Sequence, residues 1–183
     1  MNQGAPAKRF SAWDLLRLWE RNNEASVGDE LGVFQIYEMP PWDQICRVMS
    51  WDYHLVEGGY FAKKEFGFTG VYRLIALEKE GDLSKPAILN RVCGQDESGT
   101  LYIGESNDLG RRLNELRRSA GHRQGNSHGA ISMLRRITAL NYPATKLGIA
   151  VLFTGKQTES IERDLLWAYI NSFGDTPPLN YKL

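Results

Sequence analysis

The sequence predicts an α/β fold with α+β layering, in which a small and mainly antiparallel sheet is flanked by helices and preceded by a mostly helical N-terminal extension. Short segments rich in β-branched and aromatic residues alternate with longer segments of helical periodicity. Their order, β-(β)-β-α-α-β-α, is typical of helices layered on one sheet. With 183 residues, the chain can form one domain with an extension, or two small domains.

The N-terminal part is predicted to be mostly helical. Leucine and tryptophan side chains recur at helical spacing over residues 12–23, after Ser11, a residue type that caps helices. A short strand is expected over residues 31–37. The prolines that follow end that strand, and Pro41 is placed to begin a second helix over residues 42–49.

Residues 1–66 are assigned to this extension and residues 67–183 to the main domain, because the glycine-containing segment 58–67 separates them. Aromatic residues crowd the end of the extension. They can form a surface on which bases stack, or a hydrophobic seal between the extension and the main domain, and we favour the seal. The aromatic residues concerned are Trp42, Trp51, Tyr53, Tyr60 and Phe61.

The main domain is predicted to begin with a strand and to contain further strands and helices after it. Val71, Tyr72 and Tyr102 belong to residue types that favour extended backbone. Thr158 is a residue type that caps helices, and it precedes the last long helix. We expect strands over residues 68–77, 87–92, 100–104 and 147–154, and helices over residues 107–119, 128–140 and 159–172.

Composition limits the classes of protein to which the chain can belong. Hydrophobic residues make up 42% and charged residues 24%, which is ordinary for a globular domain. No apolar run reaches the roughly 20 residues that a membrane-spanning helix needs, so we expect no membrane partner. The polar N-terminus lacks the apolar core of a signal peptide, which favours a cytoplasmic protein. Cys46 and Cys93 match no zinc-binding spacing and are interpreted as buried thiols in a reducing compartment.

The net charge of zero argues against a general nucleic-acid binder, but the charges are unevenly distributed. The first third of the chain is acidic, whereas residues 111–136 carry seven arginines against a single acid, Glu115. Arginine matches the geometry of phosphate better than lysine does. These side chains can bind nucleic acid, or they can form a solvated helix face. The candidates for nucleic-acid contact are Arg111, Arg117, Arg118, Arg135 and Arg136.

One further arginine is placed at the edge of the core. Leu109, Leu113 and Leu116 form a buried stripe on the predicted helix. Arg112 lies about 60° from that stripe, while Arg111 points nearly opposite to it, at about 100° per residue. A guanidinium held at the core edge can clamp a phosphate and stabilise its transition state. The alternative is a structural pair with a carboxylate nearby.

The last predicted helix begins its apolar stripe with a carboxylate. Glu162 precedes Leu165, Leu166 and Tyr169 at spacings of three, four and seven. An unpaired buried carboxylate is costly, so Glu162 requires a hydrogen bond, a cation or a metal. A divalent ion such as Mg²⁺ prefers carboxylate oxygen and keeps waters that substrate phosphate can replace. The alternative is a salt bridge to Arg112.

Two tripeptides, Gly70-Val71-Tyr72 and Tyr102-Ile103-Gly104, each lie in a predicted strand, and a capped, arginine-containing helix follows the second. This arrangement resembles the GIY-YIG endonuclease superfamily, with Val71 in place of the usual isoleucine. The tripeptides alone are weak signals. The resemblance covers most of residues 68–183 and rests on five polar positions in the right order and elements, which are Tyr72, Tyr102, Arg112, Glu162 and Asn180.

Many members of the family carry a histidine after the arginine helix. His122 and His128 are both candidates here, and Leu116 stands where some members have theirs. His128 opens a predicted helix beside small residues, so we favour it over His122, which lies in a polar loop. The segment between the two tyrosine strands, residues 80–99, is longer than a simple hairpin needs.

The resemblance implies a metal-dependent endonuclease that hydrolyses phosphodiester bonds in DNA with a single Mg²⁺ or Mn²⁺. Tyr72, with His128, would take a proton from the attacking water. Glu162 would hold the metal, Arg112 and Tyr102 would bind the phosphate, and Asn180 would orient the site. A tyrosine is a poor base at its ordinary pKa of about 10, so a neighbouring cation must assist.

Several alternatives stay open at this point. The same fold can serve as a catalytically inactive nucleic-acid-binding module, or as a protein-interaction domain that acts through its acidic, aromatic extension. RNA stays open as an alternative to DNA. A domain of this kind holds one catalytic centre, so a double-strand break requires a homodimer or two successive nicks. The sequence does not distinguish repair, restriction, mobile-element and defence roles, and it does not indicate a target sequence.

Overall fold

The structure is a computed structural model that describes residues 40–57, 68–121, 128–154 and 158–181. The helix expected over residues 12–23 and the strand expected over residues 31–37 lie outside the described residues. The elements follow one another in the order α2 (Trp42–Val48), β1 (Asp52–Leu55), β2 (Gly70–Ala76), β3 (Leu89–Arg91), β4 (Gly94–Asp96), β5 (Thr100–Ser106), α3 (Leu109–Gly121), α4 (Gly129–Leu134), a 3₁₀ turn (Ala144–Lys146), β6 (Leu147–Phe153) and α5 (Thr158–Phe173).

The central sheet has four antiparallel strands in the order β1-β6-β2-β5. A second sheet pairs only β3 with β4, in the segment between the tyrosine strands. Because β2 lies between β5 and β6 and both of its faces are covered, all seven of its residues are buried. The α+β layered fold predicted from the sequence is therefore confirmed.

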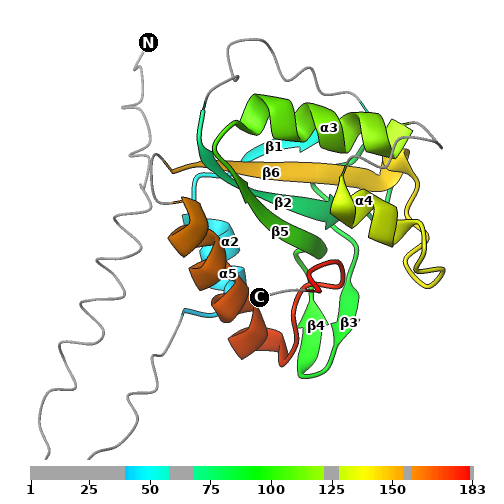
Figure 1. Cartoon of the computed structure of the whole chain (residues 1–183). Coiled ribbons are helices and arrows are strands. Elements are labelled where there is room, and N and C mark those ends of the chain that lie inside the picture. Colours follow the sequence, from blue (N-terminus) through cyan, green and yellow to red (C-terminus); the bar gives the residue numbers. More distant parts are fainter. Residues whose placement is uncertain (1–39, 58–67, 122–127, 155–157, 182–183) are drawn as a thin grey trace, which may run out of the picture.

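Helices cover both faces of the central sheet (Figure 1). On one face, the leucine stripe of α3 and the apolar side of α4 pack against Tyr72, Leu74 and their neighbours on β6. On the other face, α2 and α5 pack against Val71, Ile75 and Ile103. The alternation of side chains along β2 thus sends Tyr72 toward α3 and Val71 toward α5.

The boundary predicted near residue 67 is corrected by β1, which lies before it. Asp52 to Leu55 pair with β6 at the far edge of the central sheet. Trp42 is 1% exposed and Trp51 is 7% exposed, and both belong to the core beside α5. Residues 41–56 are therefore part of the layered domain. Trp42 and Trp51 act as the hydrophobic seal that the sequence favoured, while Tyr60 and Phe61 lie outside the described residues.

The seal encloses a buried arginine. Arg73 is 1% exposed, and its guanidinium lies 4.5 Å from the ring centroid of Trp51. Its Nη1 donates hydrogen bonds to Cys46 Sγ at 2.9 Å and to Thr100 Oγ1 at 3.1 Å. A cation enclosed by aromatic faces and polar atoms is far less costly than one enclosed by aliphatic groups. The segment 41–56 therefore stabilises a charge that β2 places in the core.

Three smaller expectations also need correction. The helix expected over residues 128–140 is shorter, because α4 ends at Leu134 and residues 135–140 continue as turns. Residues 80–99 contain a strand that was not expected, β4, which pairs with β3. Cys46 and Cys93 are free, but Cys46 is only partly buried and Cys93 is exposed. None of the helices in the described ranges combines the length and the apolar character that crossing a membrane requires.

Candidate active site

The two motif tyrosines lie on neighbouring antiparallel strands and on the same face of the sheet. Tyr72 on β2 is opposite Gly104 on β5, and Leu74 is opposite Tyr102. Residues 72 and 74 share a face because side chains alternate along a strand. The two tyrosine rings lie 5.9 Å apart between centroids. The expectation that both tyrosines occupy antiparallel strands of one sheet is confirmed.

Gly104 gives the two hydroxyl groups room to meet. A Cβ atom at this position would lie 2.9 Å from the Tyr72 hydroxyl oxygen and would also collide with the Tyr102 ring. The glycine of the first motif has a different role, because a side chain at Gly70 would meet the carbonyl of Leu152 and the side chain of Leu109. The first glycine lets β2 pack against β6 and α3, and the second shapes the site.

The hydroxyl of Tyr72 is held by an arginine and a histidine. Arg112 Nε, from the first turns of α3, donates a hydrogen bond to the Tyr72 oxygen at 3.1 Å. His128 Nε2, from the residue before α4, lies 2.9 Å from the same oxygen. The Tyr72 oxygen accepts from Arg112, and in the tautomer of His128 whose Nε2 carries no hydrogen, the phenolic proton is donated to Nε2. Arg112 thus lies at the core edge, as predicted, and the structure brings its guanidinium to the Tyr72 hydroxyl.

His128 is a neutral imidazole at physiological pH. Its side chain is buried, and burial together with the positive charge of Arg112 lowers the pKa of His128 to about 3. Nδ1 of the ring is buried without a hydrogen-bond partner. The backbone N–H of His128 donates to Ser119 Oγ at 3.1 Å, which ties the start of α4 to α3. The other candidate histidine, His122, lies outside the described residues.

Both tyrosines are protonated at neutral pH. Burial and the neighbouring Tyr102 raise the pKa of Tyr72 well above its usual value, while Arg112 acts in the opposite direction. Burial also raises the pKa of Tyr102, and there Arg112 again opposes the shift, while the negative charge of Glu162 adds to it. Tyr72 therefore needs an acceptor for its own proton before it can remove one from water, and His128 Nε2 is in place for that step.

Glu162 reaches the site from the other layer. It lies in the first turns of α5, half-buried, and its carboxylate accepts the backbone N–H of Glu105 on β5, the edge strand that also carries Tyr102. Burial and the charge of Glu105 raise the pKa of Glu162 to about 7. Among the described residues Arg112 forms its ion pair with Glu115, Nη1 to Oε2 3.5 Å, rather than with Glu162.

The surroundings of Glu162 fit a divalent cation. Glu105 Oε2 is buried and has no hydrogen-bond partner, and the negative charge of Glu105 acts on the Glu162 carboxylate nearby. Within the described ranges, no group of three or more His, Cys, Asp and Glu side chains is arranged to hold a metal. Mg²⁺ is commonly held by one or two carboxylates, with water and phosphate oxygens as its other ligands. Glu162, with Glu105 beside it, matches the protein part of such a site, in which water and phosphate oxygens would be the other ligands.

Asn180 fixes the backbone between the second tyrosine and its glycine. Its Oδ1 accepts the N–H of Ile103 at 2.9 Å, and its Nδ2 donates to the carbonyl of Ile103 at 2.8 Å. The amide thus completes the hydrogen bonds of an edge strand in the way a neighbouring strand would. Asn180 is buried and does not contact the tyrosine hydroxyls, so its contribution to the site is the position of β5.

The arginines predicted to contact nucleic acid do not form one surface with the tyrosines. Arg111 is exposed and pairs with Glu115 at 2.7 Å. Arg117 and Arg118 line a cleft on another side of α3. Arg135 donates to the carbonyl of Ser119, and Arg136 is exposed beyond the end of α4.

Three residues near the site were not assigned a role from the sequence. Gly104 makes room for the hydroxyls, and its place in the motif could have indicated this. Glu105 follows directly and brings a second carboxylate to Glu162. Ser119 holds the backbone of His128, and nothing in the sequence pattern points to that contact.

Comparisons of the chain with protein-family models, with curated proteins and with solved structures found no match.

Proposed function

We propose that the protein is a metal-dependent endonuclease that hydrolyses phosphodiester bonds in DNA. The observation that carries the proposal is the Tyr72 hydroxyl, which accepts from Arg112 at 3.1 Å and lies 2.9 Å from His128 Nε2. A buried phenol between a fixed cation and a neutral imidazole is suited to proton transfer beside an anionic substrate. A purely structural tyrosine does not need both neighbours.

The proton path follows from these two contacts. Water attacks the phosphorus atom and gives its proton to the Tyr72 oxygen, while the phenolic proton of Tyr72 moves to Nε2 of His128. The bond between phosphorus and the leaving oxygen breaks, and that oxygen takes a proton from solvent. Arg112 and Tyr102 lie beside Tyr72, where they can stabilise negative charge on the phosphate.

Substrate binding itself would prepare the base. Burial and the positive charge of Arg112 keep the pKa of His128 at about 3 in the free protein. A phosphate bound to Arg112 opposes that positive charge, so the pKa of His128 rises when substrate is present. The imidazole becomes a better proton acceptor only in the complex, which limits proton loss from Tyr72 in the free enzyme.

Glu162 is the residue proposed to hold Mg²⁺ or Mn²⁺, with Glu105 adding negative charge at the same place. When bound, such an ion would polarise a phosphate oxygen and offset charge at the leaving oxygen. The carboxylate lies near Tyr102, whose pKa it raises, so phosphate held at Tyr102 and Arg112 would also be within reach of the metal site.

The experiment is cleavage of supercoiled plasmid with Mg²⁺ or Mn²⁺ against EDTA, with wild-type protein and Glu162→Gln. We expect nicking by the wild type with metal, none in EDTA, and at least a hundredfold loss in the variant without loss of DNA binding. Undiminished cleavage by Glu162→Gln would contradict the metal assignment. A protein that binds DNA but cuts with neither metal would instead be a binding module.

A further inference from the structure

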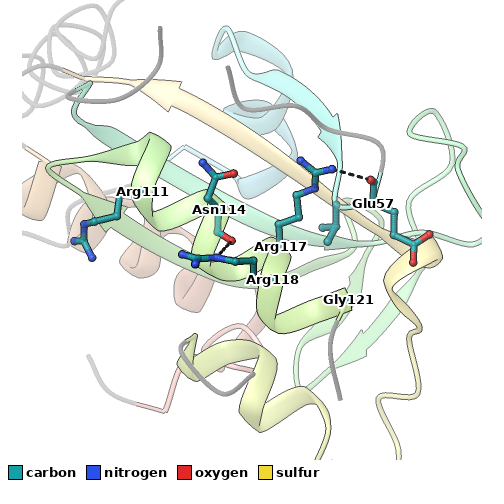
Figure 2. A pocket seen from close by; sticks show the side chains of 7 residues that line it. Glu57, Arg111, Asn114, Arg117, Arg118 and Gly121 are labelled. Atoms are coloured by element: carbon teal, nitrogen blue, oxygen red, sulfur yellow. Dashed lines mark hydrogen bonds between the residues drawn. The ribbon is translucent and has the colours of Figure 1, made fainter. Parts of the chain in front are cut away.

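A basic cleft lies beside α3 (Figure 2). Its volume is about 750 Å³. Along α3 its lining residues are centred nearly opposite Arg112, at about 100° of rotation per residue. The other wall is formed by the residues just after β1, the strand at the sheet edge farthest from β5. The seven described residues that line it are Val56, Glu57, Arg111, Asn114, Arg117, Arg118 and Gly121.

The lining is suited to an anion. Three of the seven lining residues are arginines, and Glu57 is the single acidic residue of the lining. Arg117 Nη2 donates to the backbone carbonyl of Glu57 at 3.3 Å, while the Glu57 carboxylate points away from that guanidinium (Figure 2). Arg118 Nε donates to the carbonyl of Asn114, also at 3.3 Å. Hydrogen bonds to backbone carbonyls help to hold both guanidinium groups in place, and neither of these two bonds uses the Glu57 carboxylate.

The position of the cleft relative to Arg112 indicates what kind of anion it takes. Four strands at about 4.8 Å spacing place the β1 edge and the β5 edge roughly 14 Å apart. The body of a helix with its side chains is about 10–12 Å wide, and the major groove of B-DNA, about 12 Å wide, admits one. A phosphate at Arg112 and a second at Arg117 would therefore lie on opposite sides of one helix, as phosphates on the two strands of a duplex do.

We propose that this cleft binds backbone phosphates of the strand that is not cleaved, so that α3 contacts both strands of a duplex. The inference rests on the proposed function for its statement of which strand is cut. Arg117 and Arg118 are the principal ligands, and Arg111 adds charge at the rim, where it is shared with Glu115. Direct contacts to bases are not required, because phosphate contacts position a protein without reading sequence.

The test measures binding in EDTA, so that cleavage plays no part. Wild-type protein and the variant R117E/R118E are titrated with a fluorescent duplex and with the single strand of the same sequence, over a series of salt concentrations. We expect the duplex affinity of the variant to fall at least tenfold and its salt slope to drop by about two, while single-strand affinity changes little. The conservative variant R117K/R118K should retain most of the slope, because it keeps both charges.

A matched control reverses two charges elsewhere. R47E/K79E changes the net charge equally at Arg47 on α2 and at Lys79 after β2, both exposed and outside the cleft. It should bind duplex almost as the wild type does. Equal losses for R117E/R118E and R47E/K79E would show that only net charge matters. Equal losses on duplex and single strand, or no loss at all, would also overturn the proposal.

Failure of the proposed function would look different. If the wild type cuts DNA in no metal but R117E/R118E still loses duplex binding selectively, the cleft assignment stands and the nuclease assignment fails. If the wild type cuts normally and the variant binds and cuts duplex equally well, the nuclease assignment stands and the cleft assignment fails. Thermal melts of each variant, followed by circular dichroism, confirm that binding differences do not arise from unfolding.

Discussion

The hydroxyl of Tyr72 lies 2.9 Å from Nε2 of His128, although the two residues are 56 positions apart in the chain. The tyrosine is on the central strand β2, and the histidine directly precedes α4. Buried Leu116 occupies the position on α3 where some members of the family that the sequence resembles carry a histidine. The start of α4 instead places a neutral imidazole beside the Tyr72 hydroxyl.

Glu162 should make the metal-free protein less stable as the pH rises. Burial and Glu105 raise its pKa from 4.5 to about 7 in the fold. A raised carboxyl pKa means that stability is full below the unfolded pKa and is lost as pH rises through about 7. Glu162→Gln removes this loss, so in EDTA it should melt at higher temperature than the wild type near pH 8, with almost no difference near pH 4.5.

Melting curves at several pH values check this prediction. The difference in melting temperature should grow between about pH 4.5 and pH 7 and then level off. A variant that melts lower than the wild type at about pH 8 would mean that Glu162 is a structural ion-pair partner, because removing one partner of a buried pair costs about 3–5 kcal/mol.

Gly104→Ala should impair cleavage more than stability. The added Cβ would lie 2.9 Å from the Tyr72 hydroxyl oxygen and against the Tyr102 ring, so both rings must move. A displacement of about 1 Å in a catalytic group can cost on the order of a hundredfold in rate. Plasmid cleavage and thermal melts together test this, and normal cleavage by the variant would show that the hydroxyl positions are not critical.

Asn180→Ala should destabilise the protein. The substitution leaves the N–H and the carbonyl of Ile103 without the partners that they have at 2.9 and 2.8 Å. An unsatisfied buried backbone group costs about 1–3 kcal/mol, so the free energy of unfolding should fall by about 2 kcal/mol or more. Urea denaturation measures the change, and a loss near zero would mean that water replaces the amide at this edge.

Two truncations should behave differently. Removal of residues 1–56 deletes β1 and the tryptophan side chains that cover Arg73. The sheet would lose an edge strand, and a buried cation would lose its aromatic cover. That protein should not fold cooperatively. Removal of residues 1–39 deletes none of the described elements and should leave a cooperative thermal transition. If the protein that lacks residues 1–56 also folds cooperatively, β1 and α2 are not integral to the domain.

Hydrophobic patterning predicted the long elements of the fold. The strand around Tyr72, the helix with the stripe of Leu109 and Leu113, and the last helix all appear close to their expected positions. β1 was missed because Asp52 to Leu55 show no clear alternation, and their pairing with β6 is a long-range contact. The shortened α4 has a similar cause, since Ile137 keeps the apolar spacing although it lies beyond the end of the helix.

For the candidate site, residue types could be predicted but mutual contacts could not. The two tyrosines and Arg112 were placed correctly because a strand and a helix have fixed periodicities. The partner of Tyr72 stayed ambiguous, because the path of the loop before His128 is not encoded by any periodicity. The closeness of Glu105 to Glu162 depends on how α5 packs against β5, which a local pattern does not reveal.

Single-turnover cleavage of DNA by Tyr72→Phe tests the central claim most directly. The substitution removes one oxygen atom, the one held by Arg112 and His128, and leaves the ring packing intact. We predict that DNA binding in EDTA is unchanged and that the cleavage rate with Mg²⁺ falls by about 10²–10⁴, as expected for loss of a general base. Cleavage at the wild-type rate by Tyr72→Phe would contradict the account.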